Sequence, residues 1–348
     1  MWWLRFVTRI EGMQRIAAVF LAALALATPA VAAKNAPLAP PSANAVIAYW
    51  TPERIEAAQP RDYVFDVGST RARLSIVDER ALVRSTPRPT ATPRPENIAT
   101  TTGSSWKQAG LALTVTGKVF FTMGGSNYVC SGAVVTDTRT DYSLILTAGH
   151  CVYDQELKQF ATNWLFIPAY DSTPNIIRCQ DALYGCWTAQ ALVVHSGFAS
   201  ESGLTTTAAT RDWAFAIVGA GGNQSKQLDA QVGSFQMSIN SVSVNSKVAA
   251  FGYPAASPYA GEDLVYCAGK IFEDVYSSNL TWGLPCEMTG GASGGAWVTE
   301  YSSAGGYVNS VNSYKYSDEA FMFGPKFDNA TQLTLTTADS VLVNSIVP

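Results

Sequence analysis

The feature that most constrains the fold is a succession of short β-branched and aromatic runs from about Leu111 to the C-terminus. Examples are "ALTVTGKVFFTM", "YVCSGAVVTD" and "NWLFIPAY", and glycine, asparagine, serine, aspartate or proline separates most of them. Many short strands at this spacing are typical of an all-β barrel or sandwich. The run "LTLTTADSVLV" is predicted to be the last strand. Helical periodicity is weak along the chain and is strongest in the overlapping stretch "ADSVLVNSIV". A strand-rich region of this length fits two small barrels better than one.

The N-terminus has the character of an export signal. Arg15 precedes "IAAVFLAALALATPAVAA", an apolar run that is too short and too rich in small residues to span a membrane comfortably. Its end fits the small-residue pattern of a signal-peptide cleavage site. We therefore expect a signal peptide over residues 1–33 and a secreted protein, extracellular or periplasmic. The alternative is a retained N-terminal anchor.

A proline-rich segment follows. Nine of the 17 prolines lie between residues 34 and 95, and "STPRPTATPRPE" is typical of an extended linker. Upstream of it, "YVFDVGSTRARLSIVD" alternates well enough to form a strand or two. We expect a pro-region over residues 34–105, in front of a domain over residues 106–348. The alternative is an inert linker.

Six cysteines in an exported chain indicate three disulfides, for which 15 pairings exist. Spacing narrows the choice, because two pairs of cysteines lie close together in the sequence. The pairs it favours are Cys179–Cys186, Cys267–Cys286 and, from the two cysteines that remain, Cys130–Cys151. A zinc site is a poor alternative, because the chain has no C-x-x-C pair and only two histidines. No metal is therefore expected.

Two short stretches contain residues that are suited to chemistry. "LTAGHCV" holds His150, and "TGGASGGAW" places Ser293 between two pairs of glycines. Glycines let the backbone turn sharply, so that the N–H groups of Gly291 and Ser293 point to one spot where an oxyanion can sit. The alternative is an ordinary serine in a glycine-rich turn.

The order of these residues excludes one class of hydrolase. "GASGG" matches the G-x-S-x-G elbow of α/β-hydrolases, whose catalytic histidine follows the serine. Here His150 and His195 both precede Ser293, and alternating helices are missing from the pattern. An order of histidine, aspartate and serine remains possible.

A serine nucleophile needs a neighbouring imidazole as base, and the imidazole needs a buried carboxylate to orient it. Asp212 is the best carboxylate between His150 and Ser293, because it opens the apolar run "DWAFAIV" as a lone charge. Three other aspartates lie in polar loops and are expected to be solvated surface residues. They are Asp154, Asp171 and Asp181.

"CSGAVV", "LTAGHCV", "DWAFAIV" and "GGASGGAW", in this order across residues 115–345, resemble the trypsin/chymotrypsin-like serine endopeptidases of the secreted microbial type. The resemblance implies two perpendicular six-stranded antiparallel β-barrels with the active site between them. It also implies that a Cys130–Cys151 disulfide braces the histidine loop.

Carried over by motif, the resemblance makes His150 the general base, Asp212 its orienting partner and Ser293 the nucleophile. Gly291 and Ser293 would donate the N–H groups of the oxyanion hole. His195 matches no motif of the family and is expected to be structural. The implied protein is a secreted serine endopeptidase, made as a zymogen, which hydrolyses peptide bonds without a cofactor.

The chain departs from the family at two places. Ala292 stands where many members have an aspartate that pairs with the new N-terminus. The strand "NSVNSYKY" is expected to form the substrate-binding edge, with Ser313 and Lys315 beside the specificity pocket. Glu287, six residues before Ser293, is expected at the base of that pocket, where it would slightly favour basic residues. Lys315 would either neutralise Glu287 or favour acidic residues.

Two other functions stay open at this point. One is a catalytically inactive homologue that acts as a binding protein, and the other is an esterase-like activity on the same scaffold. Only 14% of residues are charged, and the net charge of -4 gives no sign of a nucleic-acid partner. We expect a monomer that acts on polypeptides and has no membrane contact after signal removal.

Overall fold

The computed structural model describes residues 41–75, 98–171, 178–317 and 319–348. The expected signal peptide and the stretch "STPRPTATPRPE" lie outside the described residues. Within the described ranges, every helix is too short or too polar to cross a membrane.

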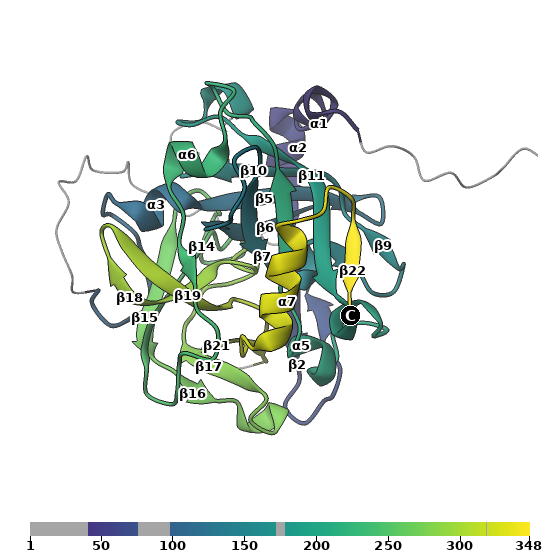
Figure 1. Cartoon of the computed structure of the whole chain (residues 1–348). Coiled ribbons are helices and arrows are strands. Elements are labelled where there is room, and N and C mark those ends of the chain that lie inside the picture. The colour runs from purple at the N-terminus through teal and green to yellow at the C-terminus, as the bar shows by residue number, and fades with distance from the viewer. Residues whose placement is uncertain (1–40, 76–97, 172–177, 318) are drawn as a thin grey trace, which may run out of the picture. The chain divides into compact units, whose positions relative to one another are not determined.

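The first barrel is a closed ring of six antiparallel strands (Figure 1). The ring closes because β6 pairs with β7 as well as with β5. In ring order the strands are β5 (Thr116–Met123), β6 (Ser126–Val135), β7 (Ser143–Thr147), β12 (Ala214–Val218), β11 (Trp187–His195) and β10 (Thr162–Pro168). Every residue of β7 and β12 is buried, as expected of strands that pack on both faces.

The second barrel is built from two sheets. Its six-stranded sheet contains β13 (Gln236–Met237), β19 (Gly305–Val311), β18 (Ala296–Ser302), β14 (Lys247–Gly252), β15 (Val265–Lys270) and β4 (Thr101–Ser105). The three-stranded sheet contains β16 (Phe272–Glu273), β17 (Thr281–Pro285) and β21 (Phe321–Pro325). The Cys267–Cys286 disulfide ties β15 to the end of β17, and the Ser310 hydroxyl donates to the Pro325 carbonyl at 2.8 Å. The predicted all-β, two-barrel fold is confirmed.

All three predicted disulfides are present, and the described residues contain no free cysteine. Short elements complete the connections. They are α3 (Leu111–Val115), η1 (Gly149–Cys151), β8 (Tyr153–Asp154), β9 (Gln159–Phe160), η2 (Cys179–Asp181), α4 (Ser196–Ala199), α5 (Thr206–Ala209), α6 (Leu228–Val232) and η3 (Val275–Ser277).

The C-terminal expectations were wrong. The run taken as a strand lies mostly in α7 (Asn329–Ala338), and the helix ends where the expected helical stretch begins. Asp328 caps the helix because its carboxylate accepts from the Ala330 and Thr331 backbone N–H groups, while the Thr331 hydroxyl accepts from the Asp328 backbone N–H. This capping box starts a helix despite the alternating sequence. The stretch beyond it ends in β22 (Ser345–Val347), which pairs in parallel with β11.

The N-terminal segment, residues 41–75, contains α1 (Ala43–Tyr49), α2 (Pro52–Ala57), β1 (Gln59–Pro60), β2 (Asp62–Phe65) and β3 (Arg73–Ser75). The strands expected in "YVFDVGSTRARLSIVD" are therefore confirmed as β2 and β3. β1 pairs in parallel with β6 of the first barrel, and β2 pairs in parallel with β20 (Lys315–Tyr316), which follows β19. The segment therefore contacts both sides of the region between the barrels.

Candidate active site

His150 lies in η1, directly after the buried strand β7. Its side chain is fully buried, and the Cys130–Cys151 disulfide ties the next residue to β6. A short helical turn held between a barrel strand and a disulfide fixes the position of the imidazole ring.

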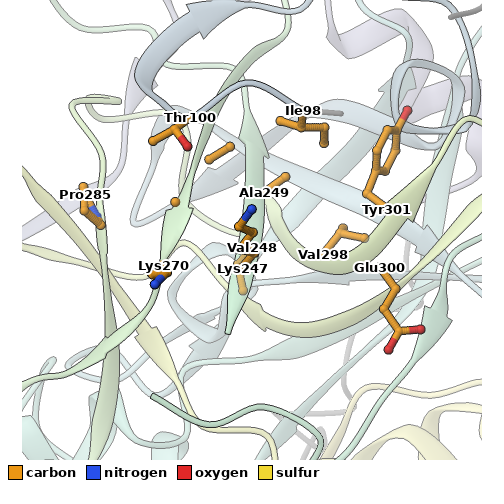
Figure 2. Close-up of a pocket in the computed structure, with 12 residues that line it drawn as sticks. Ile98, Thr100, Lys247, Val248, Ala249, Lys270, Pro285, Val298, Glu300 and Tyr301 are labelled. Carbon is orange, nitrogen blue, oxygen red and sulfur yellow. The ribbon is translucent and has the colours of Figure 1, made fainter. Parts of the chain in front are cut away.

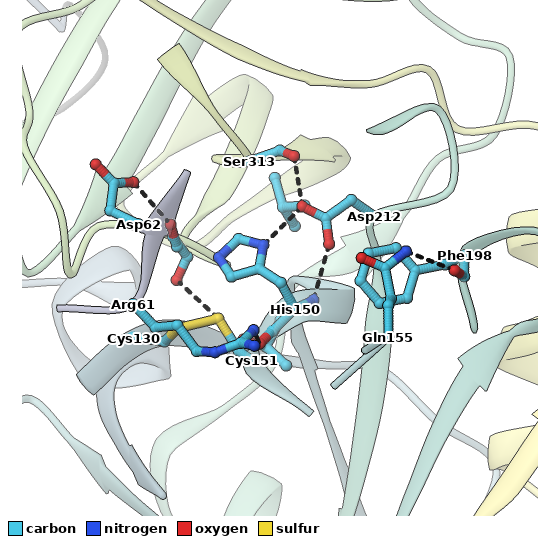
Figure 3. A network of polar contacts seen from close by, with 12 residues as sticks. Arg61, Asp62, Cys130, His150, Cys151, Gln155, Phe198, Asp212 and Ser313 are labelled. Atoms are coloured by element: carbon cyan, nitrogen blue, oxygen red, sulfur yellow. Dashed lines mark hydrogen bonds and ion pairs between the residues drawn. A yellow bond between two sulfur atoms is a disulfide. The ribbon is translucent and has the colours of Figure 1, made fainter. Parts of the chain in front are cut away.

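Asp212 precedes β12 and is fully buried (Figure 3). One carboxylate oxygen lies 2.8 Å from His150 Nδ1, and the other accepts the His150 backbone N–H at 2.9 Å. The Ser313 hydroxyl donates to the same carboxylate at 2.5 Å. When Asp212 is ionised and His150 is neutral, Nδ1 donates to the carboxylate and Nε2 carries the lone pair. This is the arrangement that a general base requires.

Ser293 lies in a tight turn whose backbone requires glycine. Gly291 and Gly294 have φ of +95° and +84°, and a Cβ on Gly294 would come within 2.2 Å of the Thr147 hydroxyl. The Ser293 carbonyl accepts from the Ser131 backbone at 2.7 Å. These contacts hold the turn against the first barrel.

Asn312 holds the same turn from the second barrel. Its amide donates to the carbonyls of Phe251 and Ala292, both at 2.9 Å, and its oxygen accepts from Trp297 Nε1 at 2.7 Å. A buried amide with partners on both ends is rigid. The two barrels together therefore fix the place of Ser293.

Among the described residues, neither Gly291 nor Ser293 uses its backbone N–H in a hydrogen bond. Buried backbone donors normally have partners, so two free N–H groups beside a serine are the donors that an oxyanion hole needs. Their role as oxyanion donors remains a prediction.

The Ser293 hydroxyl does not bond to His150 in this structure. It donates to the Asp62 carboxylate at 3.5 Å, while His150 Nε2 is buried and has no partner among the described residues. Figure 3 shows the imidazole ring between Asp212 and Asp62. Burial raises the pKa of the Asp62 carboxyl, and the charges of His150 and Lys315 oppose that rise. No motif in the sequence indicated a role for Asp62.

The neighbours of Asp62 in the N-terminal segment also contact the site. Arg61 forms an ion pair with Asp154 at 3.1 Å and donates to the His150 carbonyl at 2.5 Å. The Tyr63 ring meets the His150 ring edge-on at 5.3 Å. The expectation of a solvated Asp154 was wrong, because its side chain is 14% exposed and Arg61 covers it.

The three residues expected at the specificity pocket lie in different places. Glu287 is exposed and accepts from the Thr102 hydroxyl at 2.6 Å, so it does not form the base of a buried pocket. Ser313 directs its hydroxyl to Asp212 and supports the histidine pair. Lys315 lies on β20, and its ammonium group donates to the Met288 carbonyl at 3.3 Å.

His195 lies at the end of β11, outside the candidate site. Its Nδ1 accepts from the Gly197 backbone at 2.9 Å and caps α4. Cys130, His150 and Cys151 bring three potential metal ligands together. Both sulfur atoms belong to a disulfide, so neither can supply the thiolate that a metal would need.

The cavity in Figure 2 lies away from the candidate site. It has a volume of about 540 Å³ and is lined by residues of β14, β15 and β18 together with Ile98, Thr100 and Pro285 of β17. No member of the candidate triad lines it. The space beside Ser293 is instead occupied by the N-terminal segment.

Solved structures of proteases resemble this chain. The protease Anisep from Arthrobacter nicotinovorans is 39% identical, with a TM-score of 0.59, over 69% of this chain and 100% of that one. The thermostable serine protease AL20 from an extremophilic microorganism is 33% identical, with a TM-score of 0.57, over 66% and 98%. A Glu endopeptidase at 19% identity and a TM-score of 0.51 shares the fold. No family model and no curated protein matches the chain.

Fold, site and similarity define the class of protein. The chain belongs to the trypsin/chymotrypsin-like serine protease family. Membership of this family implies that the protein acts on polypeptides.

Proposed function

We propose that this protein is a secreted serine endopeptidase that uses His150, Asp212 and Ser293 as its catalytic triad. The observation that carries the proposal is the buried His150–Asp212 pair, which leaves an unpartnered Nε2 in the same cleft as Ser293. Three disulfides and an N-terminal apolar run support export.

The reaction is acyl transfer. His150 Nε2 accepts the Ser293 hydroxyl proton as Oγ bonds to the substrate carbonyl carbon, and the resulting oxyanion accepts from the N–H groups of Gly291 and Ser293. His150 then gives its proton to the leaving amine, and the C–N bond breaks. Water then attacks the acyl carbon while His150 Nε2 takes a proton from it. His150 returns that proton to Ser293 Oγ as the bond between the acyl carbon and Oγ breaks, and the acid product leaves. No cofactor is required.

The N-terminal segment acts as an inhibitory pro-segment. Asp62 places a carboxylate against Ser293 Oγ, and a carboxylate is a poor electrophile compared with a peptide carbonyl. Phe65 is fully buried against the ring of Tyr314 at 4.9 Å. Residues 59–65 therefore occupy the cleft, and removal of the pro-region would open it to substrate.

The mature N-terminus is proposed within residues 97–118. In this window, β4 pairs with β15, and Trp106 is buried edge-on against Phe251 at 5.2 Å. Cleavage after these elements would remove β4 from the second barrel. Ala99 and Thr100, which precede β4, are exposed and therefore accessible to a protease. Cleavage near the start of the window preserves the second barrel.

The test is labelling of the matured protein by a fluorophosphonate probe, which reacts only with an activated serine. Wild type should be labelled, while Ser293→Ala and His150→Ala should not. Absence of labelling in a folded, processed protein would favour the inactive homologue that acts as a binding protein. Turnover of matched peptide and ester substrates separates an endopeptidase from an esterase.

A further inference from the structure

Lys315 is the cation of the cleft occupied by the N-terminal segment. It pairs with Val64 across the β2–β20 ladder and is only partly exposed. Its ammonium group donates to the Met288 carbonyl, five residues before Ser293. Burial lowers the pKa of Lys315, while the charges of Asp62 and Glu287 raise it. The lysine is thus held at the cleft in an environment that disfavours its unpaired charge.

Asp62 is the acid that the segment brings to this lysine. A Cβ on Gly290 would lie 2.9 Å from the Asp62 Cβ, so the side chain lies directly on the serine turn. Its carboxylate reaches Ser293 Oγ at 3.5 Å and interacts electrostatically with Lys315. A substrate side chain next to the attacked carbonyl must lie close to the same atoms, because Oγ fixes the position of that carbonyl.

The other acid near Lys315 is already engaged. The Glu287 carboxylate accepts from the Thr102 hydroxyl, and its backbone N–H donates to the Thr102 carbonyl at 2.6 Å. Removal of the N-terminal segment takes Asp62 away and leaves Glu287 held on β4. The partly buried lysine then lacks the nearby charge of Asp62, and a desolvated charge favours a new partner.

We propose that Lys315 determines specificity by binding a carboxylate in the substrate, so that the mature enzyme cleaves after Glu or Asp. Asp62 occupies this carboxylate subsite in the precursor. The inference rests on the proposed protease function and reverses the basic preference expected from Glu287.

The experiment uses matured enzyme whose active sites are counted with the fluorophosphonate probe. Peptides that differ only by Glu or Gln before the scissile bond are compared by kcat/KM. Wild type should favour Glu by about ten- to a hundredfold, the range of one charge-assisted hydrogen bond. Moving the Glu one residue away from the bond should abolish the advantage.

Lys315→Gln should bring the Glu-to-Gln ratio close to one while the enzyme still labels and still cleaves the Gln peptide. Lys247→Gln, at an exposed position on β14, is the matched control and should keep the wild-type ratio. A labelled wild type without a Glu preference, or a Lys315→Gln variant that keeps it, overturns this inference alone. A wild type that does not label overturns the protease function and the inference together.

Discussion

Two parts of the molecule meet at Ser293, and they are held in place differently. The candidate triad is fixed within the two barrels: Asp212 accepts three hydrogen bonds, and the serine turn is held by Ser131 and Asn312. The N-terminal segment is an addition, attached by two- to four-residue strands, the Arg61–Asp154 ion pair and buried side chains that include Trp50 and Phe65. The hydrogen bonds that hold Asp212 and the serine turn come from residues outside the segment, while the segment adds the Arg61 bond to the His150 carbonyl.

The difference indicates how the precursor would be activated. Because the His150–Asp212 pair is already assembled, activation under the proposed function would need removal of the segment and only a turn of the Ser293 hydroxyl from Asp62 to His150 Nε2. Ala292 is consistent with activation by removal of the segment, because it has no carboxylate that could pair with a new N-terminus. Four experiments test the contrast between a preassembled site and an inhibitory segment added to it.

The largest effect should come from the triad itself. Ser293→Ala or His150→Ala should each lower kcat of the matured enzyme by about 10⁶, and the double variant should lose little more, because the residues act as one unit. Steady-state kinetics on one peptide substrate measures this. Losses that multiply in the double variant would contradict the assignment.

The N-terminal segment should leave the cleft more readily when the buried Arg61–Asp154 ion pair is broken. Arg61→Ala leaves Asp154 without its partner and removes the hydrogen bond to the His150 carbonyl. The free energy with which the segment binds the cleft should fall by about 2–4 kcal/mol. We expect the unprocessed precursor to label with the probe at least about tenfold faster.

Arg73→Ala is the matched control for that experiment. The Arg73–Asp66 pair lies in the same segment, but its side chains are 58% and 64% exposed, so its loss should change the labelling rate very little. Equal rates for Arg61→Ala and wild type would show that the segment does not inhibit through this contact.

A smaller effect is expected from the hydroxyl that supports Asp212. Ser313→Ala removes one of three hydrogen bonds to the carboxylate, which is worth about 1–2 kcal/mol. The matured variant should lose about five- to thirtyfold in kcat with little change in KM. Ser310→Ala, which removes a buried bond to Pro325, should lower stability and leave kcat unchanged. Equal kcat for the two variants would exclude a positioning role for Ser313.

The smallest effect concerns pH. Because burial lowers the pKa of Lys315, its positive charge is present below that pKa and is lost as pH rises through it. The Glu-to-Gln ratio of kcat/KM should therefore fall toward one at a lower pH than an ordinary lysine would give. A ratio that stays constant across the alkaline range would show that Lys315 does not bind the substrate carboxylate.

The amino-acid sequence was sufficient to predict the fold class, the disulfide pairs and the candidate catalytic residues. Each rests on local information: strand-like runs between turn residues, short cysteine spacings and a motif around His150, Asp212 and Ser293. Such patterns can be recognised without a structure because each one depends on residues that are close together in the sequence. They failed at α7, where one capping aspartate outweighed an alternating pattern.

Only the tertiary structure decided what occupies the site. Asp62 and Ser293 are 231 residues apart in the sequence, and no periodicity or motif connects them. The same holds for Arg61 with Asp154, for Ser313 with Asp212 and for Glu287 with Thr102. The physical reason is that a polar side chain takes its role from the charges and donors that surround it after folding. Those surroundings come from distant parts of the chain.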